Sequence, residues 1–235
     1  MIRLRGLAHT YDGNPPVAAL EPLDLDIADG QITAVIGRSG CGKSTLLRIL
    51  AGLVEPTAGH VHVGPTAYQP QRDALLPWRR VLANATLGAE VSGVPAEQAR
   101  ADAVELLDQF GLAGFERSWP RELSGGMRQR VALLRTFLVP RPVLLLDEPF
   151  GALDAITRAE MQSWLEAVWQ ADGRTVVLVT HDVEEALRLA DRVVVLSPRP
   201  GRVVLDLAVT SPRPRDVTAP ELVEHKRTLL HALLP

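Results

Sequence analysis

Continuous apolar runs and amphipathic segments alternate along the chain. Residues 31–36, 143–146 and 175–180 are mostly apolar and lie between turn residues, a pattern typical of parallel strands that are buried on both faces. A helix is predicted between the last two runs, because apolar residues recur there at helical spacing before a glycine. The recurring residues are Met161, Trp164, Leu165, Val168 and Trp169, and Gly173 follows them. We therefore expect both tryptophans in the core.

The middle of the chain has a different pattern. Residues 95–110 place five apolar side chains on one face of a predicted helix. We expect residues 71–120 to form a helical subdomain, inserted between two parts of a catalytic α/β core at 1–70 and 121–200. Residues 201–235 are expected to form a C-terminal extension. The chain is thus interpreted as one α/β domain with a mostly parallel sheet and a helical insert.

Composition and charge narrow the class of protein. The chain has 235 residues, 46% of them hydrophobic, and a formal net charge of -3, so it lacks the basic balance that nucleic-acid binding normally needs. The only cysteine, Cys41, excludes an internal disulfide and fits a reducing compartment. The N-terminal sequence has no apolar stretch of signal-peptide length, and every apolar run is far shorter than the roughly 20 residues that span a bilayer. We expect a cytoplasmic protein that associates with membranes only peripherally.

Residues 37–45, GRSGCGKST, match the phosphate-binding pattern GxxxxGK[ST] completely. They follow a predicted strand and begin a predicted helix, which is the context that this motif requires. We expect the backbone N–H groups of residues 39–45 to surround a β-phosphate, Lys43 to neutralise β- and γ-phosphate oxygens, and Ser44 to bind Mg²⁺. Thr45 is expected to contact the α-phosphate. The candidate nucleotide-binding residues here are Gly37, Arg38, Ser39, Gly40, Cys41, Gly42, Lys43, Ser44 and Thr45.

Two adjacent carboxylates, Asp147 and Glu148, end a buried strand. Such a pair is costly unless it meets a cation or a water that needs it. Asp147 suits the ligand shell of Mg²⁺. Glu148, expected on the opposite side of the strand, is placed to polarise the water that attacks the γ-phosphate. The alternative is that the pair only caps a turn before Pro149.

Three further residues are candidates for the same site. His181 follows the apolar run 175–180, at the carboxyl end of a predicted strand, where open α/β sheets bind ligands. This position favours a role in sensing the γ-phosphate over a structural role. Gln71 is a candidate for contact with Mg²⁺ or the attacking water, although its local sequence alone indicates a surface glutamine. Tyr11 is interpreted as a platform for the adenine ring or as a packing residue.

A second anion site is predicted in the segment LSGGMRQ, residues 123–129. Ser124 is suited to cap a helix, Gly125 and Gly126 let the backbone approach an anion, and a helix N-terminus favours negative charge. Residues 37–45 already hold the phosphates of one nucleotide. The chain's own nucleotide therefore does not need this second anion site.

The motifs GRSGCGKST, LSGGMRQ, LLLLDEPFGALD and VTHD, together with Gln71, occur in the order and approximate spacing of an ABC transporter ATP-binding subunit. The resemblance covers nearly the whole chain. It implies a P-loop NTPase core, which is a RecA-like sheet with an N-terminal antiparallel β part, and an inserted helical subdomain. It also implies hydrolysis of ATP with Mg²⁺ to power transport, with Glu148, His181 and Gln71 in catalysis and Ser44, Gln71 and Asp147 around the metal.

The same resemblance implies partners. Two copies of the chain are expected to bind head to tail as a homodimer, so that Ser124, Gly125 and Gly126 of one protomer complete the ATP site of the other. Asp154, in the motif GALD, is expected to cross this interface and couple the two sites. Two transmembrane permease subunits are expected to contact the helical insert and the segment after Gln71. This would place the chain on the cytoplasmic side of the membrane, with a periplasmic or extracellular substrate-binding protein as an indirect partner.

Three segments, RDALLPWRRVLANATLG, PFGALDAITRAEMQSWL and LSPRPGRV, resemble importers for nitrate, sulfonate or taurine, and for hydroxymethylpyrimidine-type thiamine precursors. The apolar run 75–78 indicates a partner surface, with packing under the insert as the alternative for Trp78. A soluble ABC switch usually carries two cassettes or a long coiled-coil insert. This chain has neither. A P-loop kinase or GTPase would need an acceptor-binding lid or an NKxD motif; no Asn here is followed by Lys, and such an assignment leaves the segment LSGGMRQ unexplained.

Overall fold

The main sheet is mixed and has six strands, in the order β5-β6-β7-β3-β8-β9. The computed structural model describes residues 1–234. The strands are β3 (Ile32–Gly37), β5 (Thr66–Gln69), β6 (Val143–Asp147), β7 (Thr175–Thr180), β8 (Arg192–Leu196) and β9 (Val203–Ala208). All neighbours pair in parallel except β8 and β9, which are antiparallel. The apolar runs are confirmed as strands, and every residue of β3, β6 and β7 is buried.

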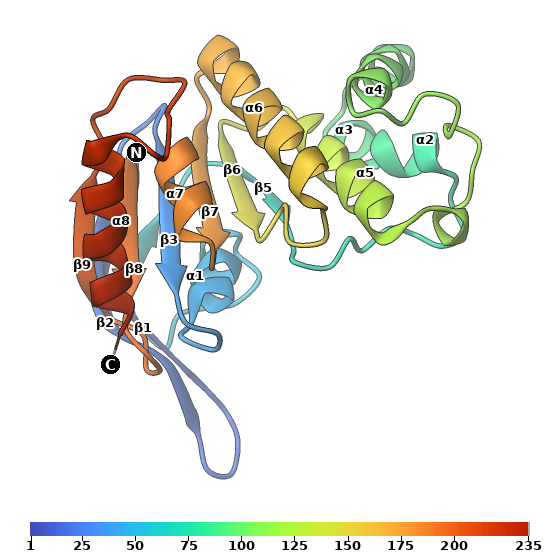
Figure 1. Ribbon diagram of the computed structural model, residues 1–235. Helices are drawn as coiled ribbons and strands as arrows, with labels where there is room; N and C mark the ends of the chain where they lie inside the picture. Colours follow the sequence, from blue (N-terminus) through green and yellow to red (C-terminus); the bar gives the residue numbers. More distant parts are fainter. Residues whose placement is uncertain (235) are drawn as a thin grey trace.

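A second, antiparallel sheet has the order β2-β1-β4. Its strands are β1 (Ile2–Tyr11), β2 (Val17–Ile27) and β4 (Ala58–His62). Figure 1 shows the hairpin of β1 and β2 projecting past the rest of the molecule. The two sheets enclose α1 (Lys43–Leu50), whose apolar face packs into a core shared with β1, β2 and β3. The phosphate loop is therefore held between two sheets.

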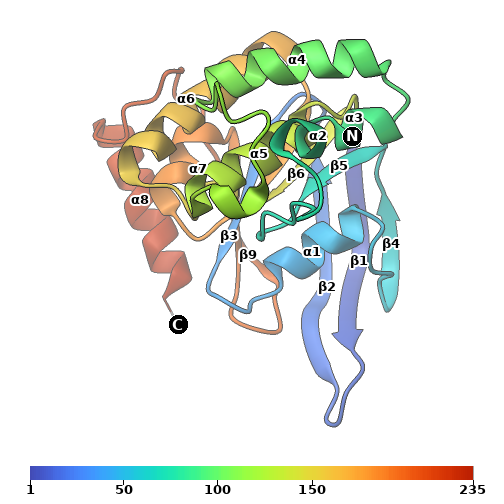
Figure 2. The same cartoon turned by 90° about the vertical axis from the view of Figure 1, so that its right-hand side faces the viewer.

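The helical subdomain lies beside the main sheet, on the side of β5 and β6 (Figures 1 and 2). It contains α2 (Val81–Ala85), α3 (Leu87–Val91), α4 (Ala96–Gln109) and the short η1 (Pro120–Glu122). The next helix, α5 (Gly125–Phe137), packs against α2, α3 and α4 and also against β5. It thus joins the insert to the sheet.

The remaining helices cover the face of the main sheet that is opposite to α1. They are α6 (Ala155–Asp172), α7 (Val183–Leu189) and α8 (Pro220–Leu233). Trp164 and Trp169 of α6 are half-buried and pack against the core, at its margin rather than in its centre. Trp164 meets Phe110 and Phe137 edge to face, with ring centroids 4.4 and 4.7 Å apart.

The segment after residue 200 is built into the core and not appended to it as an extension. β9 forms the edge of the main sheet by pairing with β8, and α8 packs on α7 and β8. Two arginines hold the segment between β9 and α8 against the core. Arg213 Nε lies 3.2 Å from Glu166 Oε1, and Arg213 Nη1 lies 2.5 Å from Asp191 Oδ1. Arg215 donates to the carbonyls of Ala190 and Val209. Among the described residues, the helices are all too short or too polar to cross a membrane.

Candidate functional site

The phosphate loop connects β3 to α1 and needs glycine for its shape. Gly42 has a φ of +105°, and a Cβ there would lie 2.6 Å from Leu20 Cδ2 and 2.7 Å from the carbonyl oxygen of Ala19. The Lys43 ammonium donates to the carbonyl oxygens of Gly37 and Arg38 at 2.7 and 3.2 Å. The loop is thereby closed around a lysine that is only 6% exposed.

Gly201 supports this loop from a distant part of the chain. Its N–H donates to Ala19 at 2.9 Å, and its carbonyl accepts from Glu21 at 3.0 Å. A Cβ at this position would lie 2.1 Å from the carbonyl oxygen of Cys41. Only glycine fits where β2, the phosphate loop and the segment before β9 meet.

A pocket of about 250 Å³ opens above the loop. Tyr11 lies at its edge, and its hydroxyl is 3.1 Å from that of Thr45. The Tyr11 ring also meets His9 edge to face, with the centroids 4.4 Å apart. The structure therefore places Tyr11 next to the phosphate loop, at the mouth of the pocket. The lining comprises Tyr11, Val17, Ala19, Ser39, Gly40, Gly42, Lys43, Ser44, Thr45, Gln71, Glu148 and Arg199.

Ser44 and Asp147 meet, as expected of two ligands of one metal. The Ser44 hydroxyl donates to Asp147 Oδ1 at 3.1 Å. Burial raises the pKa of the Asp147 carboxyl above its usual range, and the Ser44 hydrogen bond only partly offsets this. A hydroxyl and a buried carboxylate are oxygen ligands of the kind Mg²⁺ prefers, and a cation would relieve the cost of burying the carboxylate. The residues present fit Mg²⁺.

Gln71, Glu148 and His181 converge. Gln71 Nε2 donates to Glu148 Oε2 at 2.9 Å, and His181 Nδ1 lies 3.4 Å from Glu148 Oε1. Each follows the carboxyl end of a different strand, and β5, β6 and β7 are neighbours in the sheet. Parallel strands end at the same edge, so residues far apart in sequence meet there.

Glu148 lies just beyond β6 and not within the strand, contrary to the expectation that it occupies the opposite strand face. Its φ is +48°, a left-handed conformation that costs a non-glycine residue about 1–3 kcal/mol. Its N–H donates to the carbonyl of Val179 on β7 at 2.9 Å. This turn directs the carboxylate toward Gln71 and His181.

The other predicted site residues lie outside the pocket above the phosphate loop. Ser124 caps α5 by accepting from the Met127 N–H at 3.2 Å, and Gly125 is exposed on the surface. Gly126 packs against Leu153, which lies in the loop between β6 and α6. Asp154 caps α6 and accepts from the N–H of Thr157 at 3.0 Å. The segment predicted to bind a nucleotide therefore presents a free helix N-terminus away from the chain's own phosphate loop.

Trp78 is 71% exposed. This contradicts the alternative that it packs under the insert. Leu75, at the other end of the same apolar run, is buried. The run thus anchors itself through Leu75 and leaves Trp78 on the surface.

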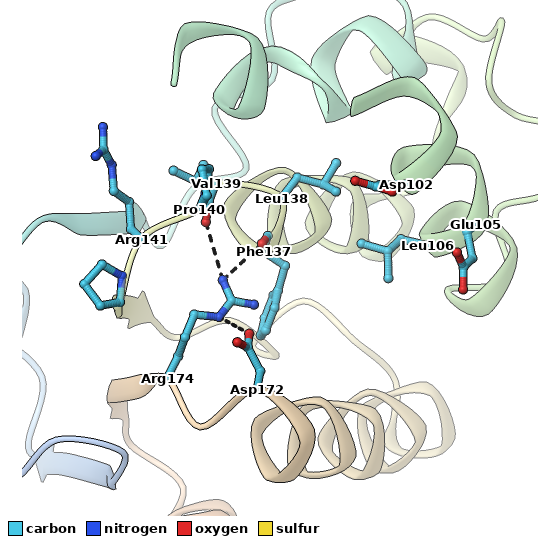
Figure 3. A pocket seen from close by; sticks show the side chains of 11 residues that line it. Asp102, Glu105, Leu106, Phe137, Leu138, Val139, Pro140, Arg141, Asp172 and Arg174 are labelled. Atoms are coloured by element: carbon cyan, nitrogen blue, oxygen red, sulfur yellow. Dashed lines mark hydrogen bonds and ion pairs between the residues drawn. The ribbon is translucent and has the colours of Figure 1, made fainter. Parts of the chain in front are cut away.

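A larger hollow, of about 600 Å³, lies at the amino ends of β6 and β7, opposite the edge that carries the site residues (Figure 3). Arg174 crosses it, pairs with Asp172 and donates to the carbonyls of Phe137 and Val139. Its guanidinium is already satisfied within the protein. The lining of the hollow contains none of the residues that the sequence motifs assign to nucleotide binding.

Four residues near the site were not predicted. Arg199 lines the pocket, Arg48 has a pKa raised by hydrogen bonds to Tyr68 and Tyr11, and Gln129 of α5 lies 3.5 Å from the Glu148 carbonyl. The fourth, Glu185, is described below. Gln129 is the last residue of the motif LSGGMRQ and Arg199 lies in the segment LSPRPGRV, whereas Arg48 and Glu185 lie in no segment that the sequence marks for function.

Comparison with known proteins gives one consistent result. Residues 20–151 match the ABC transporter domain family. The chain is 45% identical over 218 residues to the taurine import ATP-binding protein of Yersinia pestis, a match that covers 89% of this chain and 84% of that protein. It is 50% identical over 222 residues to an aliphatic sulfonates import ATP-binding protein of Mesorhizobium japonicum, with 91% and 82% covered.

The fold has solved counterparts. A dimeric ATP-binding cassette in a post-hydrolysis state, bound to ADP and Pi, superimposes with a TM-score of 0.82 at 30% identity, over 90% of this chain and all of that one (100%). A dimeric bacterial ABC transporter cassette gives a TM-score of 0.83 at 31% identity. These likenesses confirm the α/β fold with a mostly parallel sheet, an antiparallel β part and a helical insert.

Proposed function

The chain belongs to the ABC transporter family, and from this premise we propose that it is the ATP-hydrolysing subunit of an importer for taurine or related organic sulfonates. Proteins of this family bind and hydrolyse ATP to power transport, and this chain does the same. The choice of cargo rests on the names of its relatives, which import taurine and aliphatic sulfonates. The observation that carries the catalytic part is the convergence of Gln71 and His181 on Glu148.

Each residue at the edge of the sheet has a distinct task in this proposal. Lys43 and the loop N–H groups bind the phosphates of ATP. Glu148 accepts a hydrogen bond from the attacking water and polarises it, while Gln71 and His181 hold the carboxylate in place. Ser44, Asp147 and Gln71 would hold Mg²⁺, which neutralises charge on the phosphates. Tyr11 provides one face for the adenine ring.

Hydrolysis requires two protomers in this proposal. Ser124, Gly125 and Gly126 present a capped helix start to solvent, and helix starts bind anions. We place them against the γ-phosphate held by the partner protomer. Asp154 lies beside this surface and would link the two sites across the interface. The dimeric cassettes that superimpose on the chain support this arrangement.

The membrane partners are proposed from the exposed face of the insert. Trp78 is an aromatic side chain that is 71% exposed beside the segment after Gln71, and such residues are enriched at protein interfaces. We propose that two transmembrane permease subunits dock there, on the cytoplasmic side of the membrane. The substrate-binding protein would act on the far side, without touching this chain.

Replacement of Glu148 by glutamine tests the catalytic proposal. The variant should bind ATP and stay dimeric, because the amide keeps the shape of the carboxylate and one acceptor oxygen but cannot polarise the water. We expect an ATP-dependent dimer by light scattering and a loss of hydrolysis of about 10²-fold or more. Glu184→Gln, an exposed change on α7, is the control and should leave both properties unchanged. A Glu148→Gln variant that remains monomeric with ATP would refute the shared site, and normal hydrolysis by Lys43→Ala would refute the phosphate-loop assignment.

The transport part is tested separately. Purification of the tagged chain from its native cell should recover an integral membrane protein, and Trp78→Ser should weaken that association without altering the ATPase activity of the free chain. Uptake of labelled taurine should fall when Lys43 is replaced. An association that survives the Trp78 change would move the docking surface elsewhere.

A further inference from the structure

A small chamber lies next to Glu148 and His181, at the carboxyl ends of β6 and β7. Its volume is about 40 Å³, and it is enclosed by the turn after β6, the end of β7 and the first turn of α7. Glu148 and His181 line one part of it, Glu185 lines another, and Arg158 and Asp182 also contribute to the wall. A water needs about 10–15 Å³ of such space and two or more polar partners. The chamber therefore suits a bound water.

Glu185 is an unusual residue for the place it occupies. It lies in the first turn of α7, where Asp182 caps the helix by accepting from the N–H groups of residues 184 and 185. Its side chain is turned inward, and the residue is only 5% exposed. Gln162 of α6 donates to Glu185 Oε2 at 3.3 Å. Within residues 1–234, Glu185 Oε1 has no hydrogen-bond partner, and a buried carboxylate oxygen normally has one.

The charges around Glu185 are mixed. Burial is the largest influence on the Glu185 carboxyl and raises its pKa to about 7. The nearby Thr180 hydroxyl, which also lines the chamber, lowers this pKa, as do the Gln162 amide and the charge of Arg158, whereas the charge of Asp182 raises it. Glu148 and His181 face the same chamber. Because this carboxyl gains or loses a proton at about pH 7, its ability to accept or donate a hydrogen bond changes near neutral pH.

We propose that Glu185 is a positioning residue for ATP hydrolysis, which anchors a water in this chamber, and that the water orients His181 and Glu148 from behind. The proposal rests on the hydrolysis proposed above. The unpartnered Oε1 supplies one contact for the water, and the two site residues that line the chamber supply the others. Glu185 itself does not touch the nucleotide and acts through this water.

A purely structural role is the alternative to be distinguished. Through Gln162, Glu185 also ties α7 to α6. If that were its only task, its replacement by alanine would lower the stability of the fold but would leave the rate of hydrolysis per folded molecule unchanged. The two roles therefore differ in kcat and in its dependence on pH.

The experiment compares Glu185→Ala, Glu185→Gln and the control Glu184→Gln in the purified full chain. Glu184 is exposed and pairs with Lys226, so its change keeps the same helix turn and alters one charge. We expect Glu185→Ala to lower kcat by about tenfold to a hundredfold with little change in KM for MgATP, because misplacing a catalytic group by about 1 Å can cost about 10²-fold. Glu185→Gln should restore most of the rate near pH 6, where the native carboxyl is protonated. The ratio of its kcat to that of the native chain should then change between about pH 6 and pH 8.

Thermal unfolding under the assay conditions identifies variants that fail to fold. If Glu185→Ala does not fold, the pH profile of Glu185→Gln alone decides the question. Unchanged kcat in folded Glu185→Ala, or a Gln-to-native ratio that is constant with pH, overturns the proposal. A native chain that hydrolyses no ATP at all would instead overturn the function on which it rests.

Discussion

Replacement of Glu185 by glutamine is expected to stabilise the fold at about pH 8. The native carboxyl is 5% exposed, and its pKa rises from 4.5 to about 7. Burial disfavours the charged form, so above pH 7 the folded protein holds a charge that the unfolded chain would expose to water. Glutamine has nearly the same shape and carries no charge, and it can keep the contact with Gln162.

The magnitude follows from the difference between the two pKa values. Each unit corresponds to 1.36 kcal/mol, so the shift of Glu185 from 4.5 to about 7 is worth about 3 kcal/mol. Since the folded-state pKa is the higher of the two, this contribution to stability is fully present below about pH 4.5. It is lost progressively as the pH rises through about 7. Glu185→Gln should lack this loss and be more stable than the native chain by about 3 kcal/mol at pH 8.

Urea denaturation at several pH values between about 5 and 8 measures this effect. The free energy of unfolding of the native chain should fall relative to that of Glu185→Gln as the pH rises. The control, Glu184→Gln, should follow the native chain. If the native chain and Glu185→Gln show the same pH dependence, then Glu185 is ionised in the folded protein at ordinary acidic pH, and the reasoning from burial is wrong.

Two further substitutions test the supports of the site. Gly201→Ala should weaken ATP binding, because the new Cβ would lie 2.1 Å from the carbonyl oxygen of Cys41 and displace the phosphate loop. The affinity is measured with a fluorescent ATP analogue, and Gly64→Ala, whose new Cβ would meet nothing within 4 Å, is the control. Equal affinity in the two variants would contradict the supporting role of Gly201. Asp154→Ala should lower the free energy of unfolding through loss of the α6 cap, and Asp154→Asn should recover most of this loss in the same urea assay. No difference between these two Asp154 variants would mean that the cap contributes nothing.

Much of the site could be predicted because its residues occupy fixed places in local patterns. The phosphate loop is a contiguous motif, and Asp147 and His181 directly follow apolar runs that form β6 and β7. A continuous apolar run is easy to recognise, because a central parallel strand is buried on both faces. The ends of such strands then mark the edge where ligands bind.

Other parts could not be predicted, for physical reasons that differ from one another. β9 alternates half-buried and exposed residues, so it lacks the continuous apolar run of the central strands. The left-handed turn at Glu148 depends on its neighbours in β7 and not on any local signal. Glu185 stands next to exposed Glu184 in the sequence, and only the packing of α6 against α7 separates the buried carboxylate from the solvated one.

Gly201 has a consequence for how the protein is made. The phosphate loop itself is complete once residue 45 has been synthesised, but the backbone that supports it from below, through Ala19, Glu21 and the Cys41 carbonyl, arrives only with Gly201. A nascent chain therefore carries the nucleotide-binding motif long before it can hold the motif in shape. We therefore expect competence to bind ATP only after residue 201 has been synthesised, when the catalytic edge and the helical insert have already been made.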